Sequence, residues 1–230
     1  MSPYCAHMML KKRFPDKYVP SDTSIYNLIN SGDLAVKHGD TPYHPGKKKK
    51  PHIKPHEART VPGRNKISER PEEANTRAEL GHFERNTVFS SQKGKGGVLG
   101  LDDRKSRKYV SEKLNAINQK EVIKGLKRLR KRGCIGNILS VTTDNGCEFI
   151  NQKELAKILK CKVYYTRAYA AYEKGGIENC NRLFRRWFPK GTNYAKIPNE
   201  ELRRVENLIN NRPRKSLGGK SPNDYYSSVA

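Results

Sequence analysis

The order of strand-like and helix-like segments after residue 80 constrains the fold more than any other feature of this sequence. Apolar and β-branched runs bounded by glycine or polar turns predict strands, and apolar residues spaced three and four apart predict helices. The predicted strands cover residues 82–89, 97–101, 107–114, 138–143 and 162–166. The predicted helices cover 119–131 and begin again near 151, 176 and 199. Consecutive strands followed by alternating helices and strands predict a mixed α/β sheet with helices on its faces.

This element order is that of a ribonuclease H-like sheet. The predicted fold class is therefore α/β, a ribonuclease H-like mixed sheet with flanking helices, preceded by a small helix-turn-helix segment. We assign the sheet and its helices to residues 77–230, where the catalytic core of such a protein would lie.

Residues 1–36 predict two short helices joined by a tight turn. Ser2 followed by Pro3 is typical of a helix start, and Gly32 is typical of a helix end. In a helix-turn-helix, the second helix would present Thr23, Ser24 and Asn27 to a DNA groove. An ordinary helical hairpin is the alternative.

The charge of the chain predicts a polyanionic partner. The 47 Lys and Arg residues against 23 Asp and Glu residues give a formal net charge of +24, which favours nucleic acid. Residues 37–76 form a predicted basic, proline-rich linker that contains Lys47, Lys48, Lys49 and Lys50. We interpret it as an arm that follows the DNA backbone, with a merely solvated charge run as the alternative.

Two further features of the sequence bear on the cellular location of the protein. No apolar stretch reaches the length of a membrane span, so we expect no membrane role. The five cysteines form no CxxC pair and indicate reduced thiols, so we expect a cytoplasmic, nucleoid-associated protein.

Asp144 is the first candidate for chemistry. It follows the apolar strand predicted at 138–143 and precedes Asn145-Gly146, a turn-forming pair. Active groups of α/β proteins gather at the carboxyl ends of strands. A turn-forming or helix-capping aspartate is the alternative.

Glu178 is the second candidate, at the start of a basic helix. Arg182 and Arg185 follow it at four and seven residues, on nearly the same helix face. This arrangement suits a site that holds metal at one end and DNA phosphate at the other. A surface ion pair is the alternative. Lys190, Arg212 and Arg214 complete the predicted DNA-binding residues, with a solvated tail as the alternative for the run that ends in Arg214-Lys215.

Several short motifs, in order along the chain, carry a family resemblance. They are Ser2-Pro3, Thr23-Ser24-Ile25-Tyr26, Ile67-Ser68-Glu69-Arg70-Pro71, Gly81-His82-Phe83-Glu84, Asp144-Asn145-Gly146 with Glu148-Phe149, Glu178-Asn179, Phe188-Pro189-Lys190-Gly191-Thr192, and Asn211-Arg212-Pro213-Arg214-Lys215. With these motifs the chain resembles bacterial insertion-sequence transposases of the insertion-sequence-thirty family, which have a retroviral-integrase-like core.

The resemblance implies an Asp, Asp, Glu triad that binds two divalent ions, Mg²⁺ or Mn²⁺, for cleavage and transfer of DNA strands. Asp144 and Glu178 match its second and third acids, and the first acid position holds Asn86. Asparagine lacks the negative charge that a shared metal needs. Glu84 would face the same side of the strand about 7 Å away, too far to replace it. We therefore expect an inactive Asp-to-Asn variant, either engineered or natural.

The predicted function is that of a transposase that binds insertion-sequence ends and target DNA, inactivated here at position 86. We expect a homodimer or higher multimer, and the resemblance implies that further N-terminal DNA-binding sequence is missing. A catalytically dead DNA-binding regulator of transposition is the first alternative. A basic RNA-binding or ribosomal protein and a nuclease relative are the others.

Overall fold

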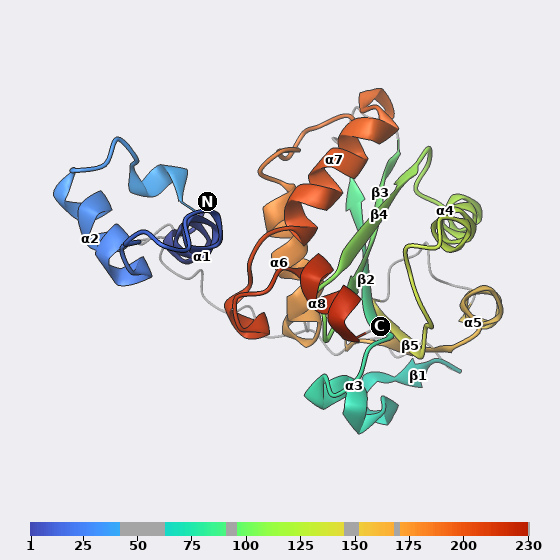
Figure 1. Cartoon of the computed structure of the whole chain (residues 1–230). Helices are drawn as coiled ribbons and strands as arrows, with labels where there is room; N and C mark the ends of the chain where they lie inside the picture. Colours follow the sequence, from blue (N-terminus) through green and yellow to red (C-terminus); the bar gives the residue numbers. More distant parts are fainter. Residues whose placement is uncertain (42–62, 91–95, 145–151, 168–170, 230) are drawn as a thin grey trace.

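The structure is a computed structural model that describes residues 1–41, 63–90, 96–144, 152–167 and 171–229 (Figure 1). Within these ranges the centre of the protein is a mixed sheet of six strands in the order β1-β6-β5-β2-β3-β4. The strands are β1 (Asn65–Lys66), β2 (His82–Phe89), β3 (Gly97–Asp103), β4 (Tyr109–Leu114), β5 (Ser140–Thr143) and β6 (Lys162–Tyr165). The predicted mixed α/β sheet is confirmed, and the strand order is consistent with a ribonuclease H-like fold.

Strand pairing places β2 and β5 side by side in the middle of the sheet. β2 is antiparallel to β3 and parallel to β5, with Glu84 opposite Thr142. β5 is also parallel to β6 and is buried along its whole length, as expected for a strand that is covered on both faces. The carboxyl ends of these parallel strands therefore meet at one edge of the sheet.

Two pairs of helices cover the two faces of the sheet (Figure 1). The helices α4 (Gln119–Lys131) and α5 (Gln152–Leu159) pack on one face, and α6 (Gly175–Phe184) and α7 (Asn199–Asn210) pack on the other. The alternation of β2 separates the two cores, because Phe83 belongs to the first and Val88 to the second. Both cores continue into the helices, through Leu126 of α4 and Ile177 of α6.

The start and the buried face of α4 follow from its local sequence. Asn118 accepts a hydrogen bond from the backbone N–H of Glu121, which caps the first turn. Val122, Leu126 and Leu129 then recur on one side of the helix and are fully buried. The predicted bounds of this helix and its apolar face are confirmed.

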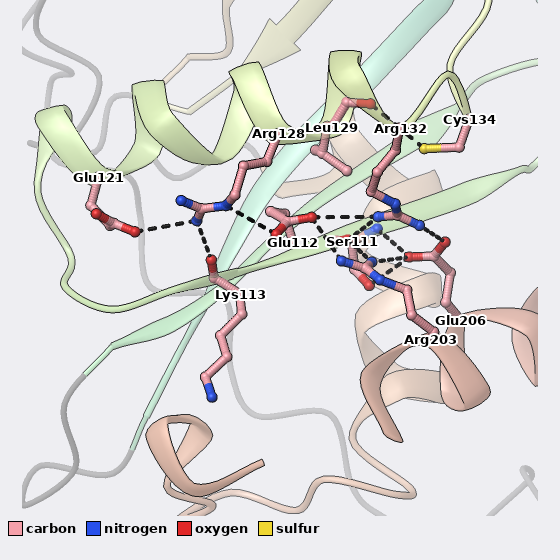
Figure 2. Close-up of polar contacts among 10 residues, drawn as sticks. All are labelled: Ser111, Glu112, Lys113, Glu121, Arg128, Leu129, Arg132, Cys134, Arg203 and Glu206. Atoms are coloured by element: carbon pink, nitrogen blue, oxygen red, sulfur yellow. Dashed lines mark hydrogen bonds and ion pairs between the residues drawn. The ribbon is translucent and has the colours of Figure 1, made fainter. Parts of the chain in front are cut away.

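An ion-pair network joins the edge strand β4 to α4 and α7 (Figure 2). Glu112 of β4 pairs with Arg203 of α7 at 2.7 Å. Glu206 of α7 pairs with Arg132, just after α4, at 2.8 Å, and accepts a hydrogen bond from the N–H of Ser111 at 2.7 Å. Because Glu112 and Glu206 are buried, these contacts fix how the helices of opposite faces meet at the edge of the sheet.

Two helices, α1 (Pro3–Arg13) and α2 (Asp22–Ser31), form the N-terminal part of the described chain. The hydroxyls of Ser2 and Ser21 cap them. The Cys5 thiol of α1 donates to the carbonyl oxygen of Pro213 at 3.2 Å, so α1 lies against the C-terminal segment. The two predicted helices are confirmed as elements, and their DNA-reading role stays a prediction.

Residues 65–76, within the range predicted as linker, form packed structure. β1 pairs with β6, with Asn65 opposite Tyr164. The helix α3 (Glu72–Thr76) buries Ala74 completely, and Arg70 donates to the hydroxyl of Thr142 at 3.1 Å. A two-residue strand and a five-residue helix are too short to give a periodic pattern, which is why the sequence did not predict them.

The helix α8 (Pro222–Val229) ends the described chain. Its Tyr226 hydroxyl accepts a hydrogen bond from the N–H of Gly136 at 3.0 Å, which ties the helix to the loop before β5. Of the helices in the described ranges, none combines the length and the apolarity needed to cross a bilayer.

Candidate active site

Asp144 lies directly after β5, at the carboxyl end of the central parallel strands. Thr143, the last residue of β5, is fully buried, whereas 39% of the Asp144 side chain is exposed. The difference in exposure between Thr143 and Asp144 arises because β5 is covered on both faces and its carboxyl end is open to solvent. The structure therefore presents this carboxylate at an accessible edge of the sheet.

Asn86 lies on β2, next to β5. The parallel register that pairs His82 with Ser140 and Glu84 with Thr142, continued by two residues, places Asn86 level with Asp144. Neighbouring strands are about 4.8 Å apart. The Asn86 side chain is half-buried, and its carbonyl oxygen accepts a hydrogen bond from the N–H of Thr87 at 2.9 Å. The first predicted position thus lies beside the second and carries a neutral amide.

Glu178 lies in the first turn of α6 and is exposed. Burial of part of its carboxyl group raises the pKa of Glu178, the Lys174 ammonium works in the opposite direction, and Glu84 of β2 raises the pKa further. Glu178 therefore lies within electrostatic reach of Lys174 and of Glu84, which is near the start of β2.

A buried lysine lies among the three predicted positions. Lys174, 5% exposed, donates from Nζ to Oδ2 of Asp144 at 2.8 Å and to the carbonyl oxygen of Arg85 at 3.4 Å. The same ammonium acts on the pKa of Glu178. Sequence reasoning missed this residue, although its spacing of four from Glu178 is the spacing of a helical ion pair and pointed to it.

The side chains at this edge do not make up a complete metal site. In the described ranges, no group of three His, Cys, Asp or Glu side chains is placed to hold a metal ion. Asp144 is paired with an ammonium group, and Asn86 offers a carbonyl oxygen in place of a carboxylate. The residues present therefore do not fit the two-ion arrangement that the family resemblance implied for an active form.

Glu84 has a structural task in place of a catalytic one. It is fully buried and forms an ion pair with Arg104. Its Oε2 accepts a hydrogen bond from the N–H of Ile177 at 2.9 Å, which holds the start of α6 against β2. Because both oxygens of the Glu84 carboxylate are engaged in these contacts, Glu84 does not supply the charge that Asn86 lacks.

Asp102 of β3 is a second buried carboxyl group under the start of α6. Burial, followed by the nearby charge of Glu84, raises the pKa of Asp102 to about 7. The Cys180 thiol of α6 donates to its Oδ1 at 3.1 Å, and Arg107 Nη1 lies 3.9 Å from its Oδ2. The sequence did not indicate that this group is buried, because the predicted strand ended at residue 101, one residue before Asp102.

The basic residues predicted on and after α6 are accessible. Arg182 is exposed and donates to the side chain of Asn179 at 2.8 Å. Arg185 ends α6 and is half-buried, and Lys190 is exposed. These side chains continue away from Glu178 along the helix and the loop that follows.

The two arginines of the C-terminal motif are both partly buried. Arg212 donates to the Cys5 sulfur at 3.2 Å, and Arg214 donates to the carbonyl oxygen of Ile209 at 3.3 Å. Arg212 therefore helps to seat α1, a packing role that the sequence did not reveal.

The predicted groove-contacting residues of α2 divide into two groups. Thr23 and Asn27 are exposed, whereas Ser24 is half-buried and bonds through its N–H to the capping hydroxyl of Ser21 at 3.1 Å. The predicted backbone contacts at Lys47, Lys48, Lys49 and Lys50 lie outside the described residues.

Comparison with known proteins identifies similar sequences among transposases. The chain is 34% identical over 171 residues to the transposase for insertion sequence element IS4351 of Bacteroides fragilis, which is 74% of this chain and 51% of that protein. It is 34% identical over 211 residues to the probable transposase for insertion-like sequence element IS1161 of Streptococcus salivarius, which is 90% of this chain and 58% of that protein.

A member of the family named by the sequence motifs also matches. The transposase InsI for insertion sequence element IS30A of Escherichia coli K12 is 33% identical over 166 residues, which cover 69% of this chain and 41% of that protein. The chain thus spans about half the length of the curated relatives it matches. No family model matches the chain.

Proposed function

This chain is a relative of the bacterial insertion-sequence transposases, including those of the insertion-sequence-thirty family, and on that premise we propose that it binds the ends of an insertion sequence. In this proposal residues 1–36 read DNA, the basic segment 37–64 follows the DNA backbone, and the sheet domain, which residues 65–76 join through β1 and α3, holds the strand-cleavage and strand-transfer site. We expect it to act as a dimer or higher multimer on end and target DNA.

The proposed cleavage site consists of position 86, Asp144 and Glu178. The observation that carries it is the register of β2 and β5, which puts Asn86, within β2, level with Asp144, directly after β5. Glu178 approaches the same edge from the first turn of α6, and Lys174 acts on both acids. These observations support a site at the carboxyl end of β5, where α/β proteins place reactive groups.

We further propose that this chain is inactive in cleavage as it stands. An active form would need Mg²⁺ or Mn²⁺ at these acids, because such hard ions favour carboxylate oxygens and activate the attacking group in phosphodiester cleavage. Here the amide of Asn86 lacks the charge, and the Lys174 ammonium occupies Oδ2 of Asp144. Both features weaken a metal site.

Restoring the carboxylate tests this proposal. Three forms are compared, wild type, Asn86→Asp and the double variant Asn86→Asp with Asp144→Asn, in nicking of a labelled insertion-sequence-end duplex with Mg²⁺ or Mn²⁺. We expect nicking only from Asn86→Asp, and binding of the end duplex by all three forms. Equal nicking by the wild type and Asn86→Asp would refute the inactivation, and absence of end binding in all forms would refute the proposed function.

A DNA-binding regulator without catalysis is the second candidate. Asn86 and the Lys174–Asp144 pair favour this candidate, because they oppose metal binding and leave the predicted DNA-binding residues unchanged. If Asn86→Asp binds ends tightly and still does not nick them, the regulator becomes the better assignment.

A further inference from the structure

A cavity of about 330 Å³ lies beside the first turn of α6. Its size falls at the lower end of the range of ligand pockets. The residues that line it are Arg77, Arg107, Gly175, Gly176, Asn179, Cys180, Arg214 and Ser216. Three arginines thus line one space. They come from the residue after α3, the β3–β4 turn and the C-terminal motif, which are more than 100 residues apart at their extremes.

The arginines of this cavity lack matching negative charge. In the described part of the chain, the Arg77 side chain forms no hydrogen bond or ion pair, and the Arg77 backbone N–H donates to the carbonyl oxygen of Glu73 at the end of α3. Burial lowers the pKa of Arg77, and the nearby charges of Arg107 and Arg104 lower it further. The Nε of Arg214 is buried without a hydrogen-bond partner. Like charges gathered in this way are costly to the free protein and favour an anionic ligand.

The acid beneath the cavity compensates only in part. Asp102 lies 3.9 Å from Arg107, but its pKa is raised to about 7, so near neutral pH it is protonated in a large fraction of molecules. The remaining positive charge points to a ligand that brings its own negative charge. Guanidinium groups bind phosphate oxygens with paired hydrogen bonds, and phosphate is therefore the matching chemistry.

The backbone of α6 adds to the fit. Gly175 and Gly176 line the cavity and leave its wall without side chains. A helix start carries partial positive charge and free N–H groups, and the capping position, Lys174, makes no side-chain hydrogen bond to this turn. Asn179 lines the cavity and directly follows Glu178, so the cavity and the third proposed site position share the first turns of α6.

We propose that this cavity binds a backbone phosphate of the DNA strand that enters the candidate active site. This inference rests on the proposed function and adds to it a defined phosphate position, held mainly by Arg77, Arg107 and Arg214. A DNA phosphodiester is favoured over a free anion because the cavity and Glu178 share the start of α6 and the chain carries a net charge of +24.

The test couples one arginine to one phosphate. A series of end duplexes, each with a single neutral methylphosphonate in one strand, is titrated by fluorescence anisotropy against wild type and Arg77→Gln. Arg77 is exposed and its side chain makes no hydrogen bond within the described ranges, so the variant, which keeps the backbone N–H bond to Glu73, is expected to fold. Lys127→Gln is the matched control, because Lys127 is exposed on α4 at the opposite face of the sheet.

We expect Arg77→Gln to weaken the unmodified duplex about tenfold, as loss of one phosphate contact does. At one position near the cleavage site, the methylphosphonate should lower the duplex affinity of wild type and of Lys127→Gln by a similar factor. The same modification should hardly change the duplex affinity of Arg77→Gln. Arg77→Lys, which keeps the charge without the planar fork, should restore part of the affinity. Equal thermal midpoints of the variants show that folding is unchanged.

Two results would overturn the assignment. If wild type binds the duplex, and every methylphosphonate lowers the duplex affinity of Arg77→Gln as much as that of wild type, the cavity holds no DNA phosphate. If inorganic pyrophosphate binds in an Arg77-dependent way while DNA binding does not change in Arg77→Gln, the cavity is a site for free anions. Loss of all duplex binding in the wild type is a different result, and it refutes the proposed function itself.

Discussion

The ammonium group of Lys174 lies 2.8 Å from Oδ2 of Asp144, at the carboxyl end of β5. The lysine is almost completely buried, whereas the carboxylate keeps contact with solvent. A cation held in this position opposes any other cation that approaches Asp144. The pair thus links the start of α6 to the central strands and also sets the charge of the candidate active site.

Removal of this ammonium should therefore improve metal binding. In the Asn86→Asp background, we expect Lys174→Met to tighten Mn²⁺ binding by about tenfold, because a unit charge a few ångströms away contributes at least that much near a protein surface. Isothermal titration with Mn²⁺ measures the change. Lys157→Met, on the exposed side of α5, is the control and should leave the affinity unchanged. Weaker binding in Lys174→Met would show that the lysine helps to build the site.

The network at the edge of the sheet should make a large contribution to stability. Glu206 is buried and accepts hydrogen bonds from Ser111, Arg132 and Arg203. We expect Glu206→Leu to lower the free energy of unfolding by about 3–5 kcal/mol, since it leaves the buried N–H and hydroxyl of Ser111 without their acceptor. It also removes one of the two carboxylates that pair with Arg132 and Arg203. Urea unfolding measures this change. Glu201→Leu removes the same charge from an exposed pair of the same helix and should have no measurable effect, and a loss equal to that of Glu206→Leu would contradict the argument.

The two glycines at the start of α6 should respond differently to an added methyl group. A Cβ on Gly176 would lie 2.6 Å from Oδ2 of Asp102 and 2.7 Å from Nη1 of Arg107, whereas a Cβ on Gly175 meets no atom within 4 Å. We expect Gly176→Ala to cost about 1–3 kcal/mol of stability and Gly175→Ala to be neutral or slightly stabilising. Thermal unfolding of the two variants checks the prediction, which fails if they have the same midpoint.

Asp102 should make stability fall as the pH rises. Its pKa is raised to about 7 in the folded protein, from about 3.9 in an unfolded chain. Between these values the folded state holds a proton that the unfolded state has lost, so the free energy of unfolding decreases with pH from about 4 to 7 and then levels off. Asp102→Asn should remove this component and gain stability relative to wild type as the pH rises.

Urea midpoints at pH 5, 6, 7 and 8 measure this effect. Asp224→Asn is the matched control, because a hydrogen bond from Ser221 lowers the pKa of Asp224 and the group stays ionised in both states over this range. Its midpoint should shift equally at every pH. Parallel pH profiles of Asp102→Asn and wild type would show that Asp102 is ionised in the folded protein throughout.

The element order and several helix boundaries follow from local sequence. His82–Phe89 and Gln119–Lys131 form the predicted strand and helix with the same bounds. Periodicity and capping act over a few residues, so they can be read along the chain. The position of Asp144 at the end of a buried strand follows in the same way. The packed segment at 65–76 does not, because its elements are too short to show a period.

The relations between side chains at the site depend on the tertiary structure. Lys174 and Asp144 are 30 residues apart, and Glu84 and Ile177 are 93 residues apart. Strand register and the packing of α6 against the sheet decide which lysine neutralises a carboxylate. They also decide which carboxylate holds the start of a helix. These long-range choices leave no local pattern. Thus the chain alone indicates the α/β sheet, the basic charge and Asn86 as the predicted first site position, whereas the fold sets the buried lysine beside Asp144.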